Sequence, residues 1–198
     1  MRIAALVLLG SLVLVAPAVA QETPVQPHKG LWGGFGFGGG VNLTSTMDEG
    51  SLWGFSAWAR IGGTLNQRVL LGAESSGWLG SRGGVDFTRG NLSGVVLFYP
   101  RGGGVFLKGG VGFAYIMSSI YSSTTVGGVY YSNSTSQSQG GFGATAGLGY
   151  DLKIGRNIYL VPEVDWYLQA VGSQTSIIFG DTPGTNNIIT LSLGLTWH

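Results

Sequence analysis

The sequence predicts an all-β protein, an eight-stranded antiparallel up-and-down β-barrel. Three observations predict this fold: a low content of charged residues, an N-terminal segment typical of exported proteins, and eight segments in which apolar and polar side chains alternate. Charged residues make up 10% of the 198 residues, whereas soluble domains have about 25%. We therefore expect much of the surface to face an environment other than water.

The first 20 residues have the three parts of a secretory signal peptide. A positively charged start is followed by an apolar run from Ile3 to Val15 and by small residues up to Ala20. A retained membrane helix is the alternative, because the stretch approaches the length of a transmembrane span. Pro17 and the small residues favour cleavage after Ala20. The expected organisation is a signal peptide at 1–20, a periplasmic leader at 21–28 and a barrel at 29–198.

Eight later segments alternate apolar and polar residues, the period of a β-strand with two different faces. The segments are Lys29–Leu43, Ser51–Leu65, Arg68–Trp78, Thr88–Tyr99, Gly104–Met117, Gly140–Lys153, Ile158–Gln169 and Asn187–Trp197. In the same order, their apolar rows include Phe35 and Phe37, Phe55 and Ile61, Leu71 and Ala73, Leu92 and Val96, Val111 and Phe113, Ala146 and Leu148, Val164 and Trp166, and Leu191 and Leu193. The fourth segment alternates least clearly. The even number of strands is typical of a transmembrane barrel.

The connections between these segments alternate in length. Those after the second, fourth and sixth segments are short, namely Asn66-Gln67, Pro100–Gly103 and Ile154–Asn157. The others are longer, and the longest runs from Ser118 to Gln139. Short periplasmic turns and longer external loops are typical of outer-membrane barrels. A soluble barrel with a solvated outer face is the alternative, which the export signal and the low total charge disfavour.

Several stretches resemble the small outer-membrane β-barrel family that includes the OmpA transmembrane domain and OmpX. They are LKGGVGFAY (Leu107–Tyr115), Gly141–Tyr167 and the final strand. The resemblance implies a location in the bacterial outer membrane, contact with its lipid and insertion by the barrel assembly machinery. It also implies that the final strand is the assembly signal, through the outward row Ile189, Leu191, Leu193, Leu195 and Trp197. Family members end on the aromatic residue, whereas here His198 follows it.

Charged residues on the polar faces predict a cluster inside the barrel. A three-residue turn, Asn66–Arg68, pairs Leu65 with Val69 and places Arg60 directly opposite Glu74. Lys108 and Glu163 lie at a similar height above their own turns, so they are expected to complete the cluster. With Asp165 the predicted lumen charge cluster is Arg60, Glu74, Lys108, Glu163 and Asp165. Asp151 and Lys153 fall on the same inner face.

The sequence indicates no catalytic residues, no metal site and no cofactor. Its two histidines, His28 and His198, lie away from the strand centres, and a GxGxxG match at Gly34–Gly39 lies inside a strand, which does not fit a dinucleotide site. No block of basic residues points to nucleic acid. We expect a structural or surface-interaction barrel with an unidentified external partner. A narrow channel or small-ligand binder with a glycine-lined lumen is the first alternative, and a lipid A-modifying enzyme the second.

Overall fold

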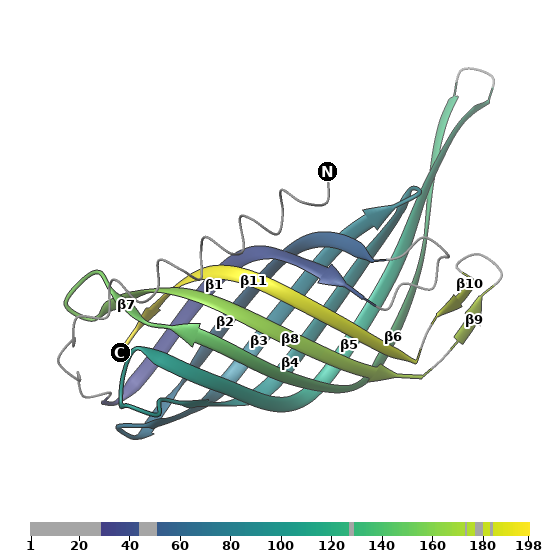
Figure 1. Ribbon diagram of the computed structural model, residues 1–198. Helices are drawn as coiled ribbons and strands as arrows, with labels where there is room; N and C mark the ends of the chain where they lie inside the picture. Colours follow the sequence, from purple (N-terminus) through teal and green to yellow (C-terminus); the bar gives the residue numbers. More distant parts are fainter. Residues whose placement is uncertain (1–28, 44–50, 127–128, 173, 177–179, 183) are drawn as a thin grey trace, which may run out of the picture.

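The computed structural model describes residues 29–43, 51–126, 129–172, 174–176, 180–182 and 184–198. The predicted signal peptide and leader, at residues 1–28, lie outside the described residues. The chain forms a closed antiparallel barrel in which each long strand lies beside its sequence neighbour (Figure 1). The predicted fold class, an eight-stranded antiparallel up-and-down barrel, is confirmed.

The barrel is a ring of eight long strands. They are β1 (Leu31–Asn42), β2 (Leu52–Asn66), β3 (Val69–Arg82), β4 (Val85–Phe98), β5 (Val105–Val126), β6 (Val129–Tyr150), β8 (Ile158–Val171) and β11 (Thr185–Trp197). The short β7 (Leu152–Lys153) pairs with β8, and β9 (Gln174–Ser176) pairs with β10 (Gly180–Thr182). Because β11 pairs with both β8 and β1, the ring has no open edge.

Two connections that the sequence predicted as long loops are mostly strand. β5 and β6 each run for 22 residues and remain paired up to Val126 and Val129, so most of the predicted loop at 118–139 is a hairpin. The hairpin extends well beyond the barrel wall (Figure 1). β3 and β4 meet at the tight turn Gly83-Gly84, where both glycines have positive φ. Both extensions were missed because these parts of the strands lack a regular apolar row.

The turn between β2 and β3 differs slightly from the prediction. The Asn66 side-chain oxygen accepts hydrogen bonds from the backbone N–H groups of Arg68 and Val69. This turn pairs Asn66 with Val69 and leaves Leu65 in a bulge, so the predicted pair of Leu65 with Val69 is wrong. From Thr64 back to Phe55 the register of β2 against β3 is the predicted one, because the bulge accommodates the extra residue next to the turn.

The two faces of the sheet differ in charge. Outward side chains such as Phe113, Leu191 and Phe37 are 53 to 76% exposed. The charged residues in the central parts of the strands all point inward and are at most 5% exposed: Arg60, Glu74, Arg89, Lys108, Glu163 and Asp165. The remaining charges of the barrel strands lie at strand ends: Arg82, Asp86 and Lys153. Lys153 is exposed at the rim, which corrects its predicted place on the inner face, whereas Asp151 is buried.

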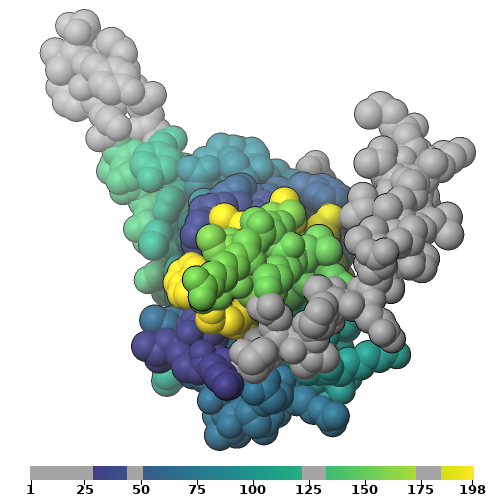
Figure 2. Space-filling model, turned by 90° about the vertical axis from the view of Figure 1, so that its left-hand side faces the viewer, coloured from purple at the N-terminus to yellow at the C-terminus, as the bar shows by residue number. Residues whose placement is uncertain are grey.

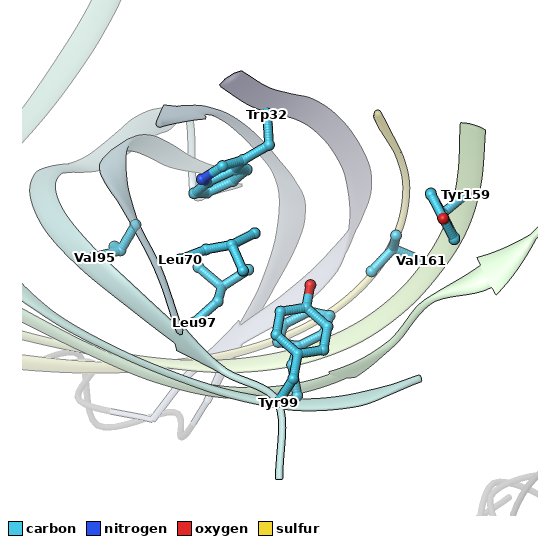
Figure 3. Close-up of a cluster of buried hydrophobic side chains, with 8 residues drawn as sticks. Trp32, Leu70, Val95, Leu97, Tyr99, Tyr159 and Val161 are labelled. Carbon is cyan, nitrogen blue, oxygen red and sulfur yellow. The ribbon is translucent and has the colours of Figure 1, made fainter. Parts of the chain in front are cut away.

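Three layers of side chains fill the lumen. At the end with the short turns, an apolar cluster includes Trp32, Leu70 and Leu97, which lie together inside the barrel (Figure 3). The charged residues form the middle layer. The opposite end, here called the loop end, holds a second apolar cluster around Trp78 and Ile188 together with buried amides. Seen from the short-turn end, the segment around β7, green in Figure 2, lies over the middle of the molecule. None of the described residues forms a helix long and apolar enough to cross a membrane.

Candidate functional site

The middle layer of the lumen is the candidate site. Four strands supply its charged residues: Arg60 comes from β2, Glu74 from β3, Lys108 from β5, and Glu163 and Asp165 from β8. All five side chains point inward because they occupy the polar positions of the two-residue period. The structure brings together the whole predicted cluster, which is called the central network below.

Arg60 binds Glu163 through two parallel hydrogen bonds. Its Nη1 and Nη2 atoms donate to Oε1 and Oε2 at 3.0 and 2.8 Å. This fork geometry is the strongest arrangement of an arginine with a carboxylate. The contact of Arg60 with Glu74, directly opposite it in the ladder, is longer at 3.4 Å. Arg60 is therefore held mainly by a strand that is not its neighbour.

Lys108 lies between three carboxylates. Its Nζ atom is 2.8 Å from Glu74 Oε2, 2.7 Å from Glu163 Oε1 and 2.8 Å from Asp165 Oδ1. The ammonium group of Lys108 is thus in ion-pair contact with all three carboxylates. Asp165 also accepts a hydrogen bond from the Tyr167 hydroxyl at 3.2 Å. Two cations and three carboxylates give the central network a formal charge of 2 − 3 = −1.

Trp58 packs against the central network. Its ring lies 3.9 Å from the Arg60 guanidinium carbon, a cation–π contact, and its Nε1 atom donates to Ser192 Oγ at 2.9 Å. The ring lies over Gly36 of β1 and Gly194 of β11, where a Cβ atom would overlap it. At these positions the inner glycines accommodate an aromatic ring rather than line an open passage.

The short-turn end contains a cluster of polar side chains that the sequence did not predict. The Tyr99 hydroxyl donates to Asp151 Oδ2 at 2.9 Å, and the Nε2 atom of His198 lies 3.4 Å from the same oxygen. Burial and the Asp151 carboxylate raise the pKa of Tyr99 well above its usual value. The His198 ring also packs edge-on against Tyr159. The residue that departs from the family pattern is thus fixed at the rim of the barrel.

The outward row of β11 faces away from the lumen over its whole length. Ile189, Leu191 and Leu193 are 40, 53 and 53% exposed, Leu195 is half-buried, and Trp197 is 47% exposed. The Trp197 ring lies over Gly33 of β1, its partner in the ladder. The row therefore forms a continuous outward apolar face on the strand that pairs with β1.

The prediction missed one buried charge, Arg89 of β4. Alternation in this segment is weak, but the buried Asn91 and Ser93 mark its inner face. Arg89 lies two and four positions before these residues, so its side chain falls on the same face of the strand. This spacing could have identified Arg89 as an inward-facing residue. In the described part of the chain, no group of three or more His, Cys, Asp and Glu residues could hold a metal ion.

Comparisons with known proteins identify the fold. No family model and no curated protein matches the chain. The crystal structure of Neisserial surface protein A (NspA) matches with a TM-score of 0.54 and 16% identity, over 87% of this chain and 99% of that one. Ail, the attachment invasion locus protein of Yersinia pestis, in complex with the heparin analogue sucrose octasulfate, matches with a TM-score of 0.52 and 16% identity, over 85% and 98%. The chain therefore has the eight-stranded barrel fold of small bacterial outer-membrane proteins.

Proposed function

We propose that the protein is an outer-membrane barrel with a structural or surface-interaction role and without catalytic activity. The observation that carries this proposal is the difference between the two faces of the sheet. Charges in the central parts of the strands face the lumen, while the outer face carries apolar residues. A lipid-facing charge near the bilayer midplane costs about 2–4 kcal/mol, so this distribution supports a barrel surrounded by outer-membrane lipid.

The hairpin of β5 and β6 is the proposed surface element. β4 accompanies β5 only as far as Ile120, and β8 accompanies β6 only from Gly141 onward. Beyond these points the two strands pair only with each other in the part of the chain that the structure describes. Tyr121 is 67% exposed, and the facing segment at 133–136 is exposed and polar. A paired polar hairpin outside the bilayer is suited to contact with an external partner.

Cysteine labelling of intact cells tests this orientation, because the chain has no cysteine of its own. In Tyr121→Cys, a membrane-impermeant maleimide is expected to react without permeabilisation. In Lys153→Cys, at the opposite end of the barrel, the same reagent should react only after the outer membrane is opened. Labelling of Lys153→Cys alone in intact cells would invert the orientation. Recovery of the protein in the soluble periplasmic fraction would contradict the membrane location.

The two alternatives have separate readouts. A filled lumen predicts no steady conductance of the refolded protein in planar bilayers, and a reproducible open level would favour the narrow channel. A lipid A-modifying enzyme would change the mass of lipid A when the protein is expressed. We expect no change, since His198 contacts Asp151 at the short-turn end and His28 precedes the first strand in the sequence.

Assembly is proposed to depend on the outward row of β11. Trp197→Asp places a charge at the membrane edge and removes the ring that covers Gly33. We expect it to reduce insertion in cells strongly, while Trp197→Phe, which keeps an aromatic ring, inserts normally. The readout is the fraction of protein that migrates as a folded barrel on an unheated detergent gel. Equal insertion of both variants would remove Trp197 from the assembly signal.

A further inference from the structure

Arg89 is a buried arginine at the loop end of the lumen. The residue is 5% exposed and points inward from β4. Its Nη1 atom donates to the backbone carbonyl oxygens of Thr88 and Met117, each at 3.1 Å. Its Nε atom is buried and has no hydrogen-bond partner among the described residues. The side chain is thus anchored at one end and keeps a free donor at the other.

No ion pair joins Arg89 to a carboxylate in the described part of the chain, and this distinguishes it from Arg60. The lumen carboxylates Glu74, Glu163 and Asp165 are all bound by Arg60 and Lys108. A buried cation without a countercharge is unfavourable because the interior does not replace its hydration. The free energy of the folded barrel would therefore fall if an anion bound beside Arg89.

A small cavity lies next to this guanidinium group. Its lining comes from four strands: Ser76 and Trp78 of β3, Arg89 and Asn91 of β4, Tyr167 and Gln169 of β8, and Ile188 of β11. It has room for roughly one water-sized occupant, the lower limit for a bound molecule. A single small ion fits this space, whereas a phosphate, a sulfate or a sugar does not.

Asn91 supplies a second free donor to the cavity. Its Oδ1 atom accepts a hydrogen bond of 2.6 Å from Gln169 Nε2, which also donates to the Gly90 carbonyl oxygen at 3.0 Å. This contact fixes the orientation of the Asn91 amide, so its Nδ2 atom is left as a buried donor without a partner. Asn91 is 2% exposed. Arg89 and Asn91, each with one unpartnered N–H donor, therefore line the same small cavity.

We propose that this cavity is an anion-binding site that takes one monovalent ion of halide size. Arg89 Nε and Asn91 Nδ2 hold the ion. The bound ion compensates the charge of Arg89 at the loop end of the lumen. A water molecule could satisfy the same two donors but not the charge, so the ion and the water are distinguished by their response to salt.

Thermal unfolding of the refolded protein in detergent tests the site. Sodium bromide is compared with sodium gluconate at equal ionic strength, because gluconate is too large for the cavity. We expect bromide to raise the midpoint temperature of unfolding until the site is saturated. The expected increase is about 2–5 °C when bromide is well above its dissociation constant. Arg89→Gln should abolish this difference. Arg82→Gln, which removes a half-buried arginine at the same end, should keep it.

A second measurement does not depend on the variants. Crystals of the unmodified protein grown in bromide should show an anomalous scattering peak between Arg89 and Asn91. A peak there, together with the salt-dependent midpoint, supports the site. Equal midpoints in both salts, an unchanged difference in Arg89→Gln, or water without anomalous signal in the cavity would each overturn the proposal.

Discussion

The middle of the lumen and its loop end each contain a buried arginine, but the groups that surround the two guanidinium charges differ. Arg60 has a bidentate carboxylate partner from β8, a second carboxylate from β3 and an aromatic ring beside it. Arg89 has two backbone carbonyl oxygens, the more distant ring of Phe87 and buried amide side chains around it. The middle layer is therefore held by charge pairs between distant strands, whereas the loop end is held by single hydrogen bonds. Substitutions should cost most in the middle layer.

The largest expected effect comes from Lys108→Met. This change leaves Glu74, Glu163 and Asp165 in the lumen with Arg60 as their only cation within the central network. Breaking a buried pair in this way typically costs about 3–5 kcal/mol. Urea unfolding of the refolded barrel, followed by tryptophan fluorescence, measures the free energy of unfolding. Lys153→Met, at an exposed rim position, serves as the control, and a similar loss in both variants would show that Lys108 has no special role.

A double-mutant cycle separates the two partners of Arg60. We expect a coupling of about 1–3 kcal/mol between Arg60→Gln and Glu163→Gln, because two short hydrogen bonds join these residues. Coupling between Arg60→Gln and Glu74→Gln should be smaller, since the contact is 3.4 Å and Glu74 keeps its bonds to Lys108. If the cycle with Glu74 gave the larger coupling, the ladder neighbour rather than β8 would be the main partner.

At the loop end, Gln169→Leu should cost less than Lys108→Met. The change leaves the Gly90 carbonyl oxygen and Asn91 Oδ1 without their donor, and unsatisfied neutral groups cost about 1–3 kcal/mol. The same urea unfolding experiment gives the comparison. Thr190→Val, a buried change on β11, is the matched control. A loss equal to that of Lys108→Met would mean that the buried amides of the loop end stabilise the barrel as much as the ion pairs do.

The smallest effect is expected for Asp165→Asn. This variant removes the carboxylate in excess of the two cations, so that Arg60 and Lys108 face Glu74 and Glu163 alone. We expect the free energy of unfolding to change by less than about 1 kcal/mol, because the loss of one bond is offset by reduced repulsion. A loss as large as that of Glu163→Gln would show that all three carboxylates are needed.

The sequence was informative where periodicity and short turns determine position. Two-residue alternation placed the charged residues of the central network on the inner face, and a short turn was enough to place Arg60 opposite Glu74. The bulge at Leu65 was not predicted, because it depends on the hydrogen bonds that Asn66 makes within the turn. The stronger partner of Arg60, Glu163, is contributed by a strand across the lumen, a contact that no local pattern specifies.

The length of the hairpin formed by β5 and β6 was harder to predict. β5 and β6 continue through a Ser- and Thr-rich segment that has no apolar row, so composition alone indicated a loop. Arg89 was missed for a related reason, since β4 has the least regular alternation of the eight strands. In both cases backbone pairing with a neighbour, rather than side-chain pattern, maintains the strand.

The contact of Trp197 with Gly33 has a consequence for the kinetics of folding. β1 and β11 are the first and last strands of the barrel, so the ladder between them can form only after the whole chain has left the ribosome. Contacts between residues so distant in the chain have a high entropic cost of loop closure, and they therefore form slowly. The indole of Trp197 reaches its final environment only when this ladder forms. In a variant without the other tryptophans, its fluorescence would report the time of ring closure, separately from the earlier formation of the hairpins.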